Sequence, residues 1–176
     1  MSLEIDVSVT AGPWHEKLPQ AEGIARAAAQ AAFDHAATAA FGHAANETAH
    51  GENAEAALVL ADDEFVRRLN RDYRGHDEAT NVLSFAALDA KTVIQNPDGA
   101  APVLLGDMVV AFETVAVEAA DQGKSVADHF SHLIVHAMLH LLGYDHETGD
   151  QAERMEGTEI LILRKLGIAD PYAEEE

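Results

Sequence analysis

Three histidines in the C-terminal third of the chain have the spacing of metal ligands. His136 and His140 are four residues apart, and His146 follows six residues later. On a helix, the four-residue spacing places two side chains on one face, with their Cβ atoms roughly 6 Å apart. Gly143 can adopt the left-handed conformation that ends a helix, so the chain can turn and bring His146 back toward the same point. The segment therefore predicts a site in which three imidazoles bind one metal ion.

Three neutral imidazoles suit Zn²⁺ and leave a fourth position open for water, as in catalytic zinc sites. The spacing equals that of the zinc proteases with the pattern H-E-x-x-H-x-x-G-x-x-H, but Ala137 stands where those enzymes carry their general-base glutamate. A metal-dependent hydrolase is the leading hypothesis, and the peptidase base is missing. The alternative is an apolar core helix that carries several histidines without binding a metal.

Two further histidines complicate the choice of ligands. His129 and His132 continue the helical spacing of His136 and His140 toward the N-terminus, so a different triad is geometrically possible. We interpret them as buried residues or as residues that donate hydrogen bonds to the site, because only His146 approaches from outside the helix. Asp145 is expected to orient a ligand. No role is assigned to His43 and His50.

Length and composition indicate one soluble globular domain. The 176 residues include no cysteine, which excludes disulfides, thiolate zinc fingers and cysteine nucleophiles and fits a reducing compartment. There is no recognisable leader and no apolar stretch long enough to cross a bilayer, so the expected location is cytoplasmic, with no membrane partner. The net charge of −20 opposes broad attraction to nucleic acid, and any contact with RNA must be local.

Four of the eleven basic residues fall within eight positions: Arg67, Arg68, Arg71 and Arg74. Residues 67, 71 and 74 share one helical face, so they could form a stripe that binds phosphate. The alternative is a solvated face on a surface helix. For Arg74 itself, the alternative to a functional role is an arginine that offsets the dipole at a helix C-terminus.

The periodicity of the chain predicts an α+β domain over residues 1–170, in which one small mixed sheet packs with about five helices. Residues 42–54 are expected to be a mobile loop, and residues 171–176 an acidic disordered tail. Strands at 82–85 and 104–112 are expected to be neighbours, separated by a turn at 96–99. The remaining expected elements are strands at 3–9 and 56–61 and helices at 19–40, 62–75, 113–122, 125–142 and 150–166.

Four motifs, in order along the chain, resemble the YbeY family of single-strand-specific endoribonucleases of bacterial rRNA maturation. They are Asn70-x-x-Tyr73-Arg74, the segment Thr80–Phe85, Leu105-Gly106-Asp107, and the His136–His146 segment followed by Met155 and Glu159. The resemblance runs from about residue 56 to 167. The sequence departs from the family at Ala137, where glycine is usual, at Ala86, where proline is usual, and at Asn81, where many members have aspartate.

The resemblance implies one zinc ion per chain on His136, His140 and His146. It implies Arg74 and His136 as catalytic residues. It also implies a role in the 3′-end processing of 16S rRNA and in ribosome quality control, with single-stranded RNA and the small ribosomal subunit or its assembly factors as partners. The oligomeric state is not indicated.

As a mechanism, we hypothesise that zinc lowers the pKa of its bound water, that the resulting hydroxide attacks an RNA phosphodiester, and that zinc and Arg74 stabilise the phosphorane. Two alternatives stay open. One is a zinc metallopeptidase that lacks the usual glutamate base. The other is a non-catalytic ribosome-assembly factor in which the metal is structural.

Overall fold

The protein is built on a four-stranded mixed sheet. A computed structural model describes residues 2–41, 53–87 and 102–173. The strand order is β1 (Ser2–Val9), β2 (Asn53–Ala61), β4 (Val103–Ala111) and β3 (Val82–Ala86). The first three strands are parallel, and β3 pairs antiparallel with β4 at the edge. The mixed sheet and the pairing of β3 with β4 confirm the expectation from the sequence.

Six helices lie in the described part of the chain, where about five were expected. They are α1 (Trp14–Lys17), α2 (Ala21–Phe41), α4 (Asp63–Arg74), α5 (Phe112–Asp121), α6 (Val126–Leu141) and α7 (Gly149–Lys165). The unexpected helix is α1, which has four residues and is too short to display a helical period. The other five begin and end within about two residues of their predicted bounds.

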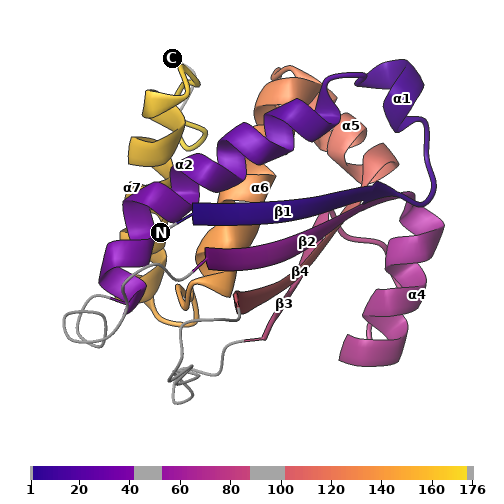
Figure 1. The fold of residues 1–176 in the computed structure, drawn as a ribbon. Coiled ribbons are helices and arrows are strands. Elements are labelled where there is room, and N and C mark those ends of the chain that lie inside the picture. Colours follow the sequence, from indigo (N-terminus) through magenta and orange to yellow (C-terminus); the bar gives the residue numbers. More distant parts are fainter. Residues whose placement is uncertain (1, 42–52, 88–101, 174–176) are drawn as a thin grey trace.

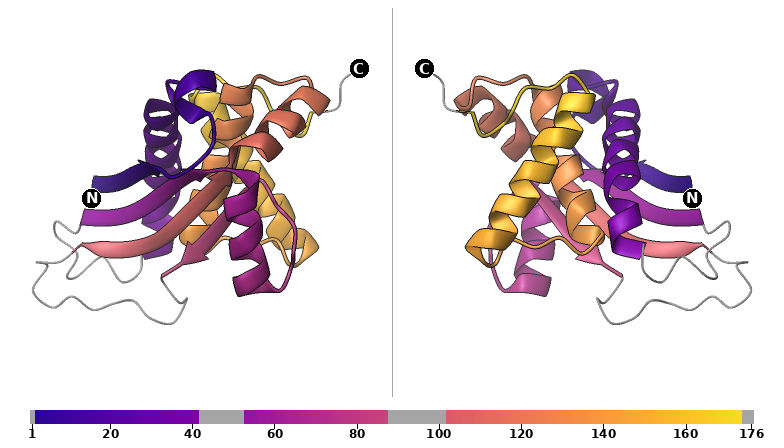
Figure 2. Two further views of the ribbon diagram at one scale, coloured as in Figure 1. Left: turned by 90° about the vertical axis from the view of Figure 1, so that its right-hand side faces the viewer. Right: turned by 90° about the vertical axis from the view of Figure 1, so that its left-hand side faces the viewer.

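The helices cover the two faces of the sheet unequally. Helices α2, α5, α6 and α7 lie on one face, and α4 lies on the other (Figures 1 and 2). Side chains alternate accordingly along β2: Leu58 and Leu60 belong to the large core under α6, whereas Ala61 belongs to a small core with Val66 of α4 and Val109. Helices α4 and α6 therefore pack against opposite faces of the sheet, and both contact its edge strand β3.

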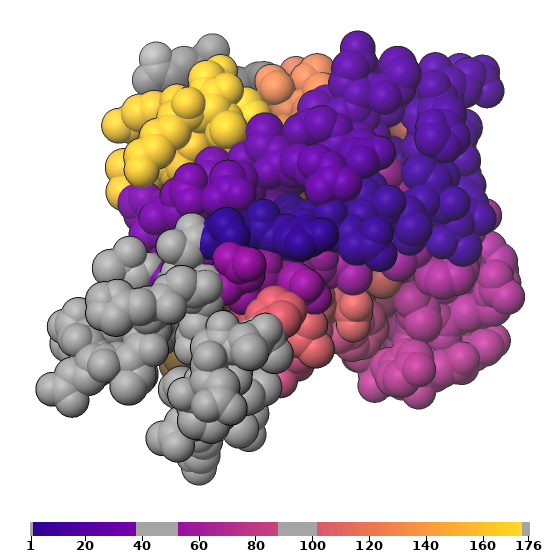
Figure 3. Space-filling model, viewed as in Figure 1, coloured from indigo at the N-terminus to yellow at the C-terminus, as the bar shows by residue number. Residues whose placement is uncertain are grey.

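Alanines allow α2 to pack closely on its neighbours. Ala25, Ala29, Ala32 and Ala36 are all fully buried, and their spacing places them on one face of the helix. Because an alanine side chain is a single methyl group, α2 can approach α6 closely along this face. Helix α7 lies beside α2 on the surface, and α4 forms a separate block (Figure 3).

Gly106 shows why one position of the third motif must be glycine. Its φ is +135°, a conformation that side chains rarely adopt, and an added Cβ would collide with the backbone carbonyl of Phe85 on β3. The close approach of β3 to β4 therefore depends on this residue.

Several expectations need correction or lie outside the described residues. Helical spacing from Leu69 predicts Tyr73 on the apolar side of α4, but the residue is 72% exposed, and its ring forms a T-shaped pair with that of Phe85. Strand β2 begins three residues earlier than expected. The proposed turn at 96–99, the loop at 42–54 up to residue 52, and tail residues 174–176 lie outside the described residues.

None of the described helices is both long and apolar enough to cross a membrane.

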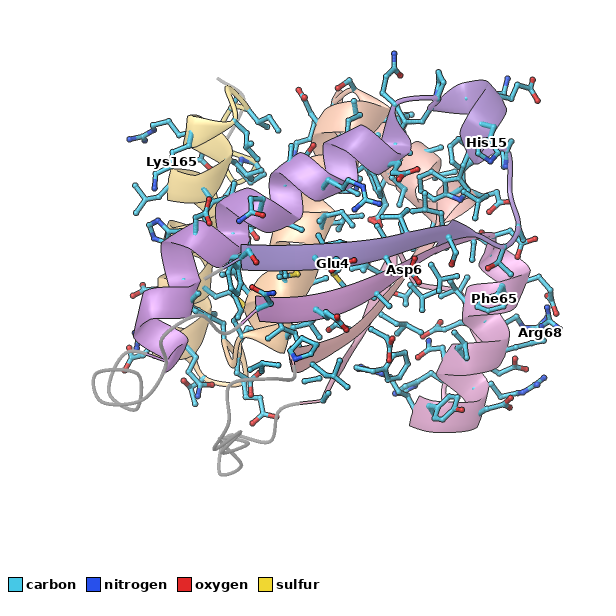
Figure 4. The ribbon with its side chains drawn as sticks, in the orientation of Figure 1. Glu4, Asp6, His15, Phe65, Arg68 and Lys165 are labelled. Atoms are coloured by element: carbon cyan, nitrogen blue, oxygen red, sulfur yellow. The ribbon has the colours of Figure 1, made fainter. Side chains whose placement is uncertain are left out.

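Part of the acidic surface lies on the sheet, where Glu4 and Asp6 project from β1 (Figure 4). With Glu55 and Asp107 they line a shallow cavity of about 340 Å³. The excess negative charge thus lies partly on the face of the sheet opposite α6.

Candidate metal centre

Helix α6 has a local capping contact at each end, and the sequence predicted the one at Gly143. At its N-terminus the Ser125 hydroxyl accepts a hydrogen bond from the backbone N–H of Asp128, at 3.1 Å. At its C-terminus Gly143 has a φ of +97°. The N–H groups of Gly143 and Tyr144 donate to the carbonyls of His140 and Leu139, which is the pattern of a Schellman turn. This turn lets the chain leave the helix and return toward it.

The turn brings the three predicted histidines together. One ring nitrogen from each of His136, His140 and His146 lies within 4.8 Å of the other two. The Nε2 atoms of His136 and His140 are 3.1 Å apart, and the His146 ring centroid is 4.9 Å from that of His140. His136 and His140 are half-buried, while His146 is exposed.

The second nitrogen of each helical histidine is already engaged. His136 Nδ1 lies 2.5 Å from Oε1 of Glu159, and His140 Nδ1 lies 3.0 Å from the carbonyl oxygen of Tyr144. Both Nδ1 atoms therefore carry the proton and donate, so each Nε2 presents a lone pair toward the other ligands. This donor set fits a metal ion that prefers neutral imidazole, such as Zn²⁺.

Glu159 of α7 supports the site by binding two histidines of α6, and the sequence did not predict this role. It is completely buried on α7, where it accepts hydrogen bonds from His136, from His132 at 3.1 Å and from the Tyr172 hydroxyl. Burial alone would raise the pKa of this carboxyl, but the three hydrogen bonds outweigh it and lower the pKa to about 2. In the sequence, the only indication of this role is that Glu159 lies between Met155 and Ile162 on the inward face of α7, where an apolar residue is expected.

Burial keeps His140 neutral. Loss of hydration lowers the pKa of its imidazole, and the neighbouring His136 and His146 lower it further. A neutral imidazole is the form that binds a metal. Partial burial of the Tyr172 hydroxyl raises the pKa of this residue above its ordinary value, and the hydrogen bond to Glu159 raises it further, so the phenol stays a donor.

The four clustered arginines divide into two kinds. Arg67 pairs with Asp77 at 2.8 Å, Arg68 with Glu64 at 3.9 Å and Arg71 with Asp72 at 2.9 Å. Figure 4 shows Arg68 on the outer side of α4. These ion pairs support the interpretation of a solvated face for the three residues.

Arg74 differs from the other three. Its guanidinium donates to the carbonyl of Ser84 at 2.9 Å and lies 5.5 Å from the ring centroid of Phe85. Among the described residues no carboxylate forms an ion pair with it. Arg74 thus contacts β3, an edge strand that also packs against α6.

Known proteins that are similar to this chain share one family name. The sequence profile described as "Endoribonuclease YbeY" matches residues 21–167. Proteins named "Endoribonuclease YbeY" from Paramagnetospirillum magneticum and Rhodospirillum rubrum are both 49% identical to this chain. The first alignment covers 99% of both chains, and the second covers 98% of this chain and 82% of the relative. The chain belongs to the YbeY endoribonuclease family.

The solution structure of TM1509 from Thermotoga maritima has a similar fold. It matches 97% of this chain and all of its own with a TM-score of 0.50 at 16% identity. This likeness supports the α+β fold inferred for a YbeY family member.

The structure also accounts for two departures from the YbeY pattern. Ala137 is fully buried in the core beside the metal centre, where a methyl group packs without loss of helix. The Asn81 side chain accepts a hydrogen bond from the N–H of Val82 and donates to Oε2 of Glu118 at 3.1 Å. An amide can donate to a carboxylate, so Asn81 suits its neighbour Glu118.

The remaining predicted residues have other contacts. Asp145 accepts a hydrogen bond from the backbone N–H of His146, at 2.7 Å, and so orders the segment that carries this ligand. His132 donates to Glu159, as expected of a residue that supports the ligands. His129 has no hydrogen-bond partner for either ring nitrogen within the described structure.

Proposed function

We propose that the protein is a single-strand-specific endoribonuclease that acts in 16S rRNA 3′-end maturation and ribosome quality control. It holds one Zn²⁺ ion per chain through His136, His140 and His146. The observation that carries the proposal is the convergence of the three ring nitrogens within 4.8 Å of one another, in a chain of the YbeY family. When bound, zinc supplies Lewis acidity that lowers the pKa of water and stabilises charge on a phosphoryl oxygen.

The residues of the chain prepare this chemistry. Glu159 fixes the ring of His136 through Nδ1, and Tyr144 fixes that of His140, so two ligands are oriented before a metal arrives. Because His136 both binds the metal and is anchored to a buried carboxylate, we assign it as a catalytic residue together with Arg74.

Arg74 is proposed to bind the phosphate that is cleaved. Its one hydrogen bond to Ser84 leaves further N–H groups of the planar guanidinium available for two phosphate oxygens. No carboxylate in the described part of the chain forms an ion pair with Arg74, whereas Arg67, Arg68 and Arg71 each have such a partner. It can therefore offset the negative charge that develops on phosphorus.

A peptidase role is not favoured. Position 137 is a buried alanine, and the nearby buried glutamate, Glu159, is engaged by three donors. It holds the rings in place and has no free oxygen with which to activate a water for attack on a peptide.

We further propose that the protein acts in the cytoplasm, with the small ribosomal subunit or its assembly factors as partners.

The test is cleavage of a single-stranded RNA that spans the 3′ end of 16S rRNA. Zinc-loaded and metal-free protein would be compared with Arg74→Ala and with Arg71→Ala, which removes a paired arginine from the same helix. We expect cleavage by the loaded wild type and by Arg71→Ala, and loss of cleavage in Arg74→Ala and in the metal-free protein. Product ends would identify the nucleophile, because a 2′,3′-cyclic phosphate arises only from attack by the ribose.

Equal traces of cleavage in all samples would contradict the proposal. The non-catalytic assembly factor with a structural metal would then be favoured. Under that alternative His136→Ala would lower thermal stability and ribosome binding together, without any cleavage to lose.

A further inference from the structure

A second cavity lies directly beside the metal centre. It has a volume of about 380 Å³ and lies between the end of α5, helix α6 and the segment that follows α7. His136 forms part of its wall, so the cavity borders the metal ligands. Its other polar walls include Asn81, Glu118, Lys124 and His129, and Tyr172 also lines it.

His129 is the least expected feature of this cavity. Its side chain is only 3% exposed, yet neither ring nitrogen has a hydrogen-bond partner in the described structure. Its nearest charged neighbour is Glu118, whose Oε2 is 3.5 Å from Nε2. A buried polar group without a partner is costly, and such groups are few in folded proteins. Its position in a cavity wall indicates that a ligand completes its hydrogen bonds.

The charges around the cavity select the kind of ligand. Glu118 offers a carboxylate, held in place by the Asn81 amide at 3.1 Å. Lys124 offers an ammonium group, held by the carbonyl of Pro171 and the amide oxygen of Gln122, each at 3.0 Å. A bare anion would meet the carboxylate, and a bare cation would meet the ammonium. A neutral ligand with donors and acceptors on one edge satisfies both.

We propose that this cavity binds a guanine base of the RNA, next to the phosphate that is cleaved; this rests on the proposed function. Guanine presents two adjacent N–H donors, which a carboxylate such as that of Glu118 can accept together. It also presents a neighbouring carbonyl that can accept from Lys124 or His129. The ring of Tyr172 is 42% exposed and offers a surface on which the base can stack. Single-stranded RNA can supply such an unstacked base.

The first experiment measures binding of guanosine, adenosine, cytidine and uridine to the full chain, by calorimetry and by the NMR signals of the histidine rings. We expect guanosine to bind more tightly than the other three, and to shift the ring signals of His129. Glu118→Gln and His129→Asn should each weaken guanosine binding about tenfold or more, which is the usual discrimination from a paired contact to a base. Glu153→Gln, which removes an exposed carboxylate of α7, should bind guanosine as the wild type does.

Several results would overturn the inference. One is equal affinity for all four nucleosides, and another is guanosine binding that survives Glu118→Gln and His129→Asn in folded protein. A second equivalent of zinc that binds the wild type and is lost in both variants would also overturn it, because the cavity would then be an ion site. Failure of the proposed function is distinguishable: guanosine would still bind while RNA stayed intact. Cleavage of RNA with no preference for guanine beside the cut would contradict this inference alone.

Discussion

The two halves of helix α6 each carry two histidines on the same helical face, in different surroundings. In the C-terminal half, Nδ1 of His136 and of His140 has an acceptor from another segment, and the Nε2 atoms converge. In the N-terminal half, His129 is buried without a partner, and His132 is tied to Glu159. Helical periodicity alone cannot separate ligands from other histidines. The ring nitrogen that is engaged makes the distinction: it is Nδ1 in His136 and His140, which leaves Nε2 free, but Nε2 in His132.

The largest predicted effect tests the C-terminal half directly. His140→Ala removes a ligand whose neutral ring is oriented by Tyr144, so we expect loss of zinc binding and of RNA cleavage. Metal content of the purified protein and a cleavage assay would measure both. His15→Ala, at an exposed histidine (Figure 4), is the control and should keep both properties. Full zinc content in His140→Ala would contradict the assignment of this ligand.

A smaller effect is expected from removing the carboxylate that the two halves share. Glu159→Gln keeps the size of the side chain but can no longer accept from His132, His136 and Tyr172 with a full negative charge. We expect zinc affinity to fall by about 10- to 100-fold, as for other carboxylates that orient a metal-bound histidine. Competition with a chromophoric chelator would measure the affinity, with Glu153→Gln as the exposed control. An unchanged affinity would show that Glu159 serves only the fold.

The C-terminal half of α6 also depends on the turn that follows the helix. Because Gly143 has a φ of +97°, Gly143→Ala should lower the free energy of unfolding by about 1–2 kcal/mol. Zinc affinity should fall as well, since this turn positions His146. Gly157→Ala is the matched control: this residue lies inside α7 with open space around it, and alanine should stabilise the protein by about 0.5–1 kcal/mol. Denaturant unfolding of both variants would measure the difference.

The smallest effect is a pH dependence that belongs to the N-terminal half. Burial lowers the pKa of His129 below its ordinary value of 6.5, and the nearby Glu118 only partly offsets this. The unfolded chain therefore takes up a proton near pH 6.5 before the folded chain does, so stability is complete above that pH and decreases as the pH falls below it. Metal-free His129→Asn should lose less thermal stability between pH 7.5 and 5.5 than metal-free wild type. An identical loss would contradict burial of a neutral His129.

The sequence predicted the elements and the cluster of three histidines better than the residues that support this cluster. The alternation in residues 3–9 and the helix end at Gly143 depend on local physical rules, and the structure follows them. Helix α1 was missed because four residues are too few to show a period, and Tyr73 was misplaced because the short strand β3 covers little of α4. Glu159 interrupts an apolar stripe of α7. Its partners lie on other elements, so only the folded chain reveals them.

The exposure of His146 has a consequence for the rate at which a metal would be exchanged. Two of the three clustered histidines lie on a helix most of whose other side chains are buried in the core, so they can move apart only if the domain opens. The third lies on an exposed segment after the turn, and local motion of that segment is enough to detach it. We expect ion release to begin at His146 and to proceed faster than global unfolding. A chelator would then remove the ion from protein that remains folded.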